Sequence, residues 1–137
     1  MNVAFADTSF YVGLLSKRDA LHDKVLTFLA TFDGRIVTTE FVLIEVANFN
    51  SRPADRPSFV NLTNQIKADA RTELIASSND LFDRGVRLFA ARLDKEWSLT
   101  DCISLVVMTE RGLTDALTAD AHFEQAGFHA LLRDPAA

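Results

Sequence analysis

Cysteine, proline and the single-copy aromatics Trp97 and Tyr11 are scarce in this 137-residue sequence. With Cys102 as its one cysteine, the chain cannot form an internal disulfide, and a zinc site built from several cysteines is excluded. Residues 1–7 lack the basic start and apolar stretch of a signal peptide. No apolar run approaches the roughly 18 residues that a membrane span needs. We therefore expect a cytoplasmic protein with no membrane association.

Positive charge is also in short supply. Fourteen lysines and arginines stand against nineteen acids, for a formal net charge of -5. Proteins that bind nucleic acids are usually basic, because phosphate contacts need lysine and arginine. The charge balance therefore argues against a general nucleic-acid binder, unless several acids gather around bound cations.

The hydrophobic pattern alternates short apolar runs with longer segments of helical periodicity, and it contains no repeat or linker. We therefore expect one domain over residues 1–137, with an α/β fold: a doubly wound parallel sheet flanked by helices in three α/β/α layers. The expected strands are residues 3–6, 35–38, 73–77, 116–119 and 130–132. The expected helices are residues 10–15, 21–32, 40–49, 58–70, 78–93, 98–111 and 121–126, with Gly112 ending the sixth.

Four acids fall where such a sheet binds its ligands, in the crevice beyond the C-terminal ends of the strands. Asp7 closes the first strand and Asp120 closes the fourth. Asp101 opens a helix, and Glu45 lies about one and a half turns into the helix after the second strand. If strands one and four are neighbours, all four carboxylates converge at that edge.

Each acid also has a purely structural interpretation. Asp7 and Asp120 suit helix N-caps, and Asp101 suits the first turn of a helix, where the dipole favours an acid. Glu45 is harder to explain in this way, because its helix is apolar on nearly every face and should bury it. A buried, unpaired carboxylate costs several kcal/mol or takes up a proton. Either a bound cation or a distant basic side chain would compensate.

Clustered carboxylates repel one another, so the arrangement makes sense with a metal bound. Carboxylates and water are the ligands that Mg²⁺ or Mn²⁺ prefers. Such a site activates water and stabilises the oxygens that attack and leave in phosphodiester cleavage. The same repulsion predicts that Asp101→Asn raises the melting temperature of the metal-free protein.

The surroundings of the four acids resemble the four motifs of PIN domains, especially the VapC-type toxin ribonucleases. The first is Asp7-Thr8-Ser9 after an apolar strand, and the others are residues 38–46, 98–102 and 117–123. Each motif is weak alone, but all four occur in the family's order and span the chain.

The resemblance implies a Mg²⁺- or Mn²⁺-dependent endoribonuclease, a homodimer and, for a toxin, a cognate antitoxin. It implies that Asp7 and Asp101 hold the metal most directly, that Glu45 and Asp120 complete the cluster, and that Thr8 or Ser9 supports the site. The alternatives are a solitary PIN-like nuclease acting on other RNA or on DNA, and a degenerate PIN interaction module. Retention of all four acids argues against the degenerate module.

Other residues offer weaker signals. His122 is the one histidine near the expected site, but packing or surface exposure is the favoured interpretation, because metal-activated water needs no histidine. Trp97 can stack a base, although packing is favoured over stacking. A basic set can hold phosphates, with a solvated surface as an equal alternative. This set comprises Lys17, Arg18, Arg52 and Arg56.

Overall fold

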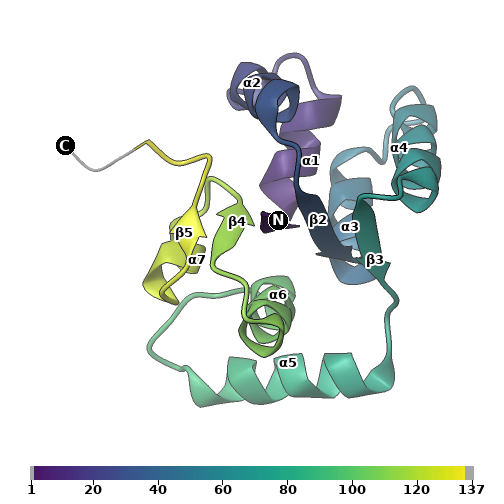
Figure 1. Cartoon of the computed structure of the whole chain (residues 1–137). Coiled ribbons are helices and arrows are strands. Elements are labelled where there is room, and N and C mark those ends of the chain that lie inside the picture. The colour runs from purple at the N-terminus through teal and green to yellow at the C-terminus, as the bar shows by residue number, and fades with distance from the viewer. Residues whose placement is uncertain (1, 135–137) are drawn as a thin grey trace.

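The computed structural model describes residues 2–134, and in them five parallel strands form one sheet in the order β3-β2-β1-β4-β5 (Figure 1). The strands are β1 (Val3–Ala6), β2 (Arg35–Thr39), β3 (Thr72–Ile75), β4 (Asp115–Leu117) and β5 (His129–Ala130). The helices are α1 (Thr8–Leu15), α2 (His22–Thr31), α3 (Glu40–Phe49), α4 (Arg56–Ala68), α5 (Asn79–Ala91), α6 (Leu99–Arg111) and α7 (Ala121–Gln125). The predicted α/β class is confirmed.

The central strand β1 explains why this sheet needs covering on both sides. Ala4, Phe5 and Ala6 are all at most 1% exposed, as expected for a parallel strand between two others. Phe5 pairs with Val37 of β2 on one side and with Ala116 of β4 on the other. The core therefore forms around β1.

The connections run outward from β1 in both directions. The chain steps from β1 to β2 to β3 through α1–α4, and then crosses back to β4 and β5 through α5–α7. Right-handed crossovers place these two groups on opposite faces, and Figure 1 shows α1 and α2 on one side of the strands and α5 and α6 on the other. The strand order reverses between β1 and β4, which opens a ligand crevice beyond their C-terminal ends.

Local signals set several helix ends where the sequence predicted them. Thr39, Ser78 and Ser98 cap α3, α5 and α6 by accepting hydrogen bonds from backbone N–H groups. Gly112 ends α6 with a φ of 64°, a left-handed conformation that glycine adopts without steric cost.

The predicted element boundaries need small corrections. Strand β4 ends at Leu117, because the Thr118 hydroxyl accepts a hydrogen bond from the Asp120 N–H and turns the chain out of the sheet. Strand β3 begins one residue and β5 one residue earlier than expected, and helix α1 begins at Thr8 rather than residue 10. No helix within residues 2–134 is long and apolar enough to cross a membrane.

Candidate metal centre

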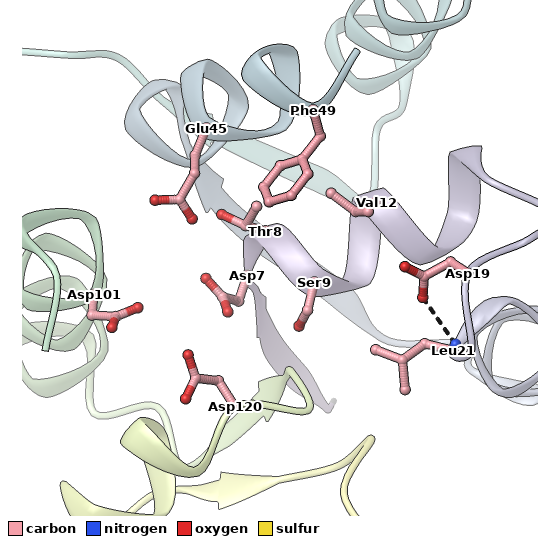
Figure 2. Close-up of a pocket in the computed structure, with 10 residues that line it drawn as sticks. All are labelled: Asp7, Thr8, Ser9, Val12, Asp19, Leu21, Glu45, Phe49, Asp101 and Asp120. Atoms are coloured by element: carbon pink, nitrogen blue, oxygen red, sulfur yellow. Dashed lines mark hydrogen bonds between the residues drawn. The ribbon is translucent and has the colours of Figure 1, made fainter. Parts of the chain in front are cut away.

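A cavity lies at the crevice between β1 and β4, and all four acids singled out in the sequence line it: Asp7, Glu45, Asp101 and Asp120. Figure 2 shows their carboxylates directed toward a common space. The acids come from the end of β1, the middle of α3, the start of α6 and the start of α7. The reversal of strand order thus brings together residues more than 110 positions apart.

Asp7 is the most deeply placed of the four, at 4% exposure. Its Oδ2 accepts a hydrogen bond of 2.9 Å from the Thr118 hydroxyl, whereas its Oδ1 is buried without a partner. Burial is the main reason that the pKa of Asp7 is raised to about 7. The Thr8 backbone and the Thr118 hydroxyl act to lower this pKa, and the charges of Asp101 and Glu45 contribute to raising it. It occupies the N-cap position of α1 but makes no side-chain cap bond. Helix capping therefore does not account for this carboxylate.

Asp101 and Asp120 do fill the structural roles that sequence allowed for them. Asp101 forms a capping box with Ser98 at the start of α6, while remaining 6% exposed. Asp120 caps α7, and its Oδ1 accepts a 2.9 Å hydrogen bond from the His122 N–H. Both carboxylates cap a helix and also line the cavity. Each can therefore serve as a cap and belong to the site at the same time.

Glu45 was expected to be buried, and this expectation is wrong. The side chain is only partly buried, because its helix neighbours Ile44 and Phe49 are 58% and 67% exposed. The helix is apolar on nearly every face, but α3 is covered on only part of its circumference. Glu45 lies in the cavity wall with access to water, and Figure 2 shows it above Asp7.

His122 is the residue that the sequence analysis undervalued. Its Nδ1 lies 2.8 Å from Asp101 Oδ2 and 3.3 Å from Asp120 Oδ1. Ligand atoms of these three residues all lie within 4.8 Å of one another. Burial works to lower the pKa of His122, but the hydrogen bond to Asp101 and the charges of Asp120 and Asp101 raise it overall. Its position two residues after Asp120, in the first turn of a short helix, was the available signal.

Hydroxyl groups tie the cavity floor together. Ser9 Oγ lies 3.2 Å from Thr118 Oγ1 and accepts from the Ala119 N–H at 3.2 Å. Thr118, which sequence did not single out, is fully buried and bonds both Asp7 and the Asp120 N–H. Thr8 Oγ1 is buried without a partner. Ser9 and Thr118 thus hold the end of β1 against the loop after β4.

Several other polar or aromatic residues do not line the acidic cavity. Trp97 is 5% exposed and donates its Nε1–H to Gln125, which supports packing over base stacking. Cys102 is buried, and His22 Nδ1 lies 2.8 Å from the Gly13 carbonyl oxygen. Arg56, the first residue of α4, donates from Nε to the Ser51 carbonyl in the loop before that helix.

The composition of the cavity fits a hard divalent cation. The wall carries five carboxylates, those of the four clustered acids and of Asp19, and no lysine or arginine. None of the four clustered acids pairs with a basic residue other than His122 within residues 2–134. The distant basic partner left open by the sequence is therefore not found there. The buried Oδ1 of Asp7 has no hydrogen-bond donor, and oxygen ligands are what Mg²⁺ and Mn²⁺ select.

Comparison with known proteins identifies the family to which the chain belongs. Residues 4–129 match the model of the PIN domain, which covers nearly the whole chain. The chain belongs to the PIN-domain family. The resemblance noted in the four motifs is thereby confirmed.

Among curated proteins, this PIN domain is similar to the 23S rRNA-specific endonuclease VapC20 of Mycobacterium tuberculosis. The two are 27% identical over 125 residues, which cover 90% of this chain and 94% of the relative. The crystal structure of that bacterium's VapC20, described as a Sarcin-Ricin loop cleaving toxin, superimposes with a TM-score of 0.82 at 24% identity, covering 93% of this chain and 96% of that one.

Two further solved structures share the fold at lower identity. VapBC2 from Rickettsia felis, bound to a DNA fragment from its promoter, matches with a TM-score of 0.64 at 15% identity over 93% of this chain and 96% of that chain. A toxin-antitoxin complex from Klebsiella pneumoniae matches with a TM-score of 0.59 at 19% identity over 86% and 87%.

Proposed function

We propose that this PIN domain is a Mg²⁺- or Mn²⁺-dependent endoribonuclease and the toxin of a type II toxin-antitoxin pair. The observation that carries the proposal is the buried, unpartnered Oδ1 of Asp7, in a cavity that the other three clustered acids also line. The similarity to a 23S rRNA-specific endonuclease supports RNA as the substrate. The toxin-antitoxin complexes among the structural neighbours support a cognate antitoxin. A homodimer and a single domain over residues 1–137 belong to the same proposal.

The proposed metal ligands form two groups, which differ in how firmly the fold holds their side chains. Asp7 and Asp101 hold the cation most directly, since both are buried and each has one oxygen fixed by a hydrogen bond. Glu45 and Asp120 are more exposed and complete the cluster. His122 supplies a ring nitrogen at the same place, either as a further ligand or as a donor that orients Asp101.

When bound, a divalent cation supplies an activated water and stabilises the charge that develops on the phosphate oxygens. The residues of the chain position the carboxylates that would hold the cation. Thr118 holds Asp7 Oδ2, and the Ser98 N–H holds Asp101 Oδ2, so both carboxylates keep their orientation before substrate arrives. Such preorganisation matters, because groups that orient metal ligands commonly contribute about 10- to 100-fold to affinity or activity. Ser9 keeps the Thr118 hydroxyl in place.

Asp120 and Asp115 provide a matched test of the proposed site. They lie toward opposite ends of β4, and their side chains are 37% and 40% exposed. Each lies near a histidine: Asp120 is 3.3 Å from His122, and Asp115 is 3.5 Å from His129. Asp120 follows the strand at the cavity, whereas Asp115 begins it at the opposite edge of the sheet. The two variants therefore make the same charge change in similar exposure at opposite ends of one strand.

The assay measures cleavage of end-labelled single-stranded RNA, with single-stranded DNA alongside, in Mg²⁺ or Mn²⁺ and in chelator. We expect the parent to cut RNA in metal alone, Asp120→Asn to lower the rate by about 100-fold or more, and Asp115→Asn to leave it within about threefold. Preferential DNA cleavage would favour the solitary-nuclease alternative. Absence of metal-dependent cleavage, or equal losses in the two variants, would contradict the proposal.

A further inference from the structure

A cavity wall with five carboxylates and no lysine or arginine repels the phosphates of the substrate, so the affinity for RNA has to come from elsewhere on the protein. Two further cavities adjoin the site. One shares Phe49 with the acidic cavity, and the other is lined by His122. Their charges decide which of them a polyanion would enter.

The cavity beyond Phe49 is basic. Lys17 and Arg18 from the loop after α1 and Arg52 from the loop after α3 line it, with Asp55 as its one acid. All three cations are exposed, and none forms a salt bridge with another residue in the part of the chain that the structure describes. We call this cavity the basic groove. Its cations are available to a ligand.

The cavity beside His122 has no such excess of positive charge. Lys95 is accompanied there by Glu96 and by Asp94, which is paired with Arg92, so these charges nearly cancel. A polyanion leaving the acidic site is therefore attracted more strongly toward the basic groove than toward the His122 side.

Phe49 connects the acidic cavity to the basic groove. It lies one helical turn after Glu45 on α3, which places both side chains on one face of the helix. Phe49 is 67% exposed and lines the acidic cavity, and in Figure 2 its ring lies above Thr8 and beside Val12. An exposed aromatic ring beside a positively charged track is the combination by which proteins hold single-stranded nucleic acid.

We propose that single-stranded RNA leaves the acidic site over Phe49 and enters the basic groove, with one base stacked on the Phe49 ring. Its backbone phosphates contact Lys17, Arg18 and Arg52. This assignment rests on the proposed function, because it takes the acids as the place where RNA is cut. It gives the substrate a direction across the protein that the acids alone do not provide.

The first test is the salt dependence of RNA affinity. Anisotropy of a labelled 12-nucleotide single-stranded RNA is measured without divalent cation, so that hydrolysis does not intervene. The groove variant replaces three cations by glutamine, and a control variant replaces three exposed arginines that lie far from the cavity and also form no salt bridge within residues 2–134. The groove variant is Lys17→Gln, Arg18→Gln and Arg52→Gln, and the control is Arg35→Gln, Arg71→Gln and Arg87→Gln.

Each phosphate contact with single-stranded nucleic acid contributes about 0.7 to the logarithmic salt slope. Loss of three contacts therefore lowers the slope by about 2, so the parent weakens about 20-fold more than the groove variant between about 50 and 200 mM salt. The control variant should keep the slope of the parent. Equal slopes for parent and groove variant, or equal losses in the two variants, would overturn the proposed path.

The second test addresses stacking. Phe49→Leu keeps apolar bulk but removes the aromatic face, and should weaken RNA binding by about 5- to 150-fold, the range for loss of one stacked base. Phe49→Trp should retain the affinity of the parent. Unchanged RNA affinity in Phe49→Leu would overturn the stacking contact and point to a protein partner for the exposed ring.

These measurements are separable from the test of cleavage. If the parent binds RNA with the groove-dependent slope but does not cut it in metal, the proposed function fails and the groove assignment stands. If the parent cuts RNA but the slopes are equal, the groove assignment alone fails.

Discussion

Replacing Asp7 by asparagine should stabilise the metal-free protein while abolishing its activity. The carboxyl group is 4% exposed, one of its oxygens lacks a donor, and Asp101 and Glu45 repel its charge. Asparagine has nearly the same shape and no charge. Its amide oxygen can accept the Thr118 hydrogen bond, and its NH₂ group would face the neighbouring carboxylates as a donor.

The magnitude follows from the pKa of Asp7. Burial raises this pKa from 3.8 to about 7, so the folded protein binds more protons than the unfolded chain between pH 4 and 7. The free energy of unfolding therefore falls as the pH rises from 4 to 7. Above pH 7, Asp7 contributes no further pH dependence. About three pKa units at 1.36 kcal/mol each set a ceiling near 4 kcal/mol. Entry of water into the open cavity lowers this to about 2–4 kcal/mol.

The assay is thermal and denaturant unfolding of parent and variant in chelator, from pH 4 to 8. Groups that titrate in the same way in both proteins do not contribute to the difference in stability between them. We expect the melting temperature of the variant to exceed that of the parent by an amount that grows between pH 4 and 7. The difference should reach about 6–15 °C, at roughly 3–4 °C per kcal/mol for a chain of this length. Millimolar Mg²⁺ or Mn²⁺ should raise the melting temperature of the parent and much less that of the variant.

Asp101→Asn is the contrasting variant. The sequence predicted that it too would stabilise the metal-free protein, but its Oδ2 accepts hydrogen bonds from the Ser98 N–H and from His122. Loss of a charge-assisted capping interaction offsets the relief of repulsion, so we expect no gain. If Asp7→Asn melts at or below the parent throughout pH 4–8, the argument from desolvation is wrong.

Three other predictions follow from single contacts. Glu45→Gln should reduce RNA cleavage by about 100-fold or more, as expected for a metal ligand, while Glu40→Gln should retain it, because Glu40 accepts from the Ser77 N–H and its glutamine oxygen can do the same. Thr118→Val should lower metal affinity or cleavage by about 10- to 100-fold, with rescue by Thr118→Ser, because only serine keeps the donor to the site. Gly85→Ala should cost about 1–3 kcal/mol in denaturant unfolding without altering cleavage per folded molecule, because the added methyl group would overlap an α6 side chain.

The sequence determined the elements whose signals are local. Strand β1 and helix α3 begin and end at the predicted residues, since an apolar run bounded by an acid and a threonine-capped helix are specified by near neighbours. The end of α6 at Gly112 is set in the same way. The four acids could be singled out because each stands next to an element boundary or inside an apolar stretch. A carboxylate in an apolar stretch is unfavourable unless a partner or a bound cation compensates its charge.

The tertiary structure decided what depends on partners distant in the chain. The pairing of β1 with β4 brings Thr118 to Asp7 across 111 positions, and no local pattern specifies that neighbour. His122 became part of the acidic cluster because α7 folds back against the start of α6. Phe49 is exposed and Glu45 is only partly buried, because α3 is covered on part of its circumference. Periodicity indicates which residues are apolar but not which helix faces pack against a neighbour. Burial and electrostatics are properties of the assembled fold, so they appear only when the strands have taken their order.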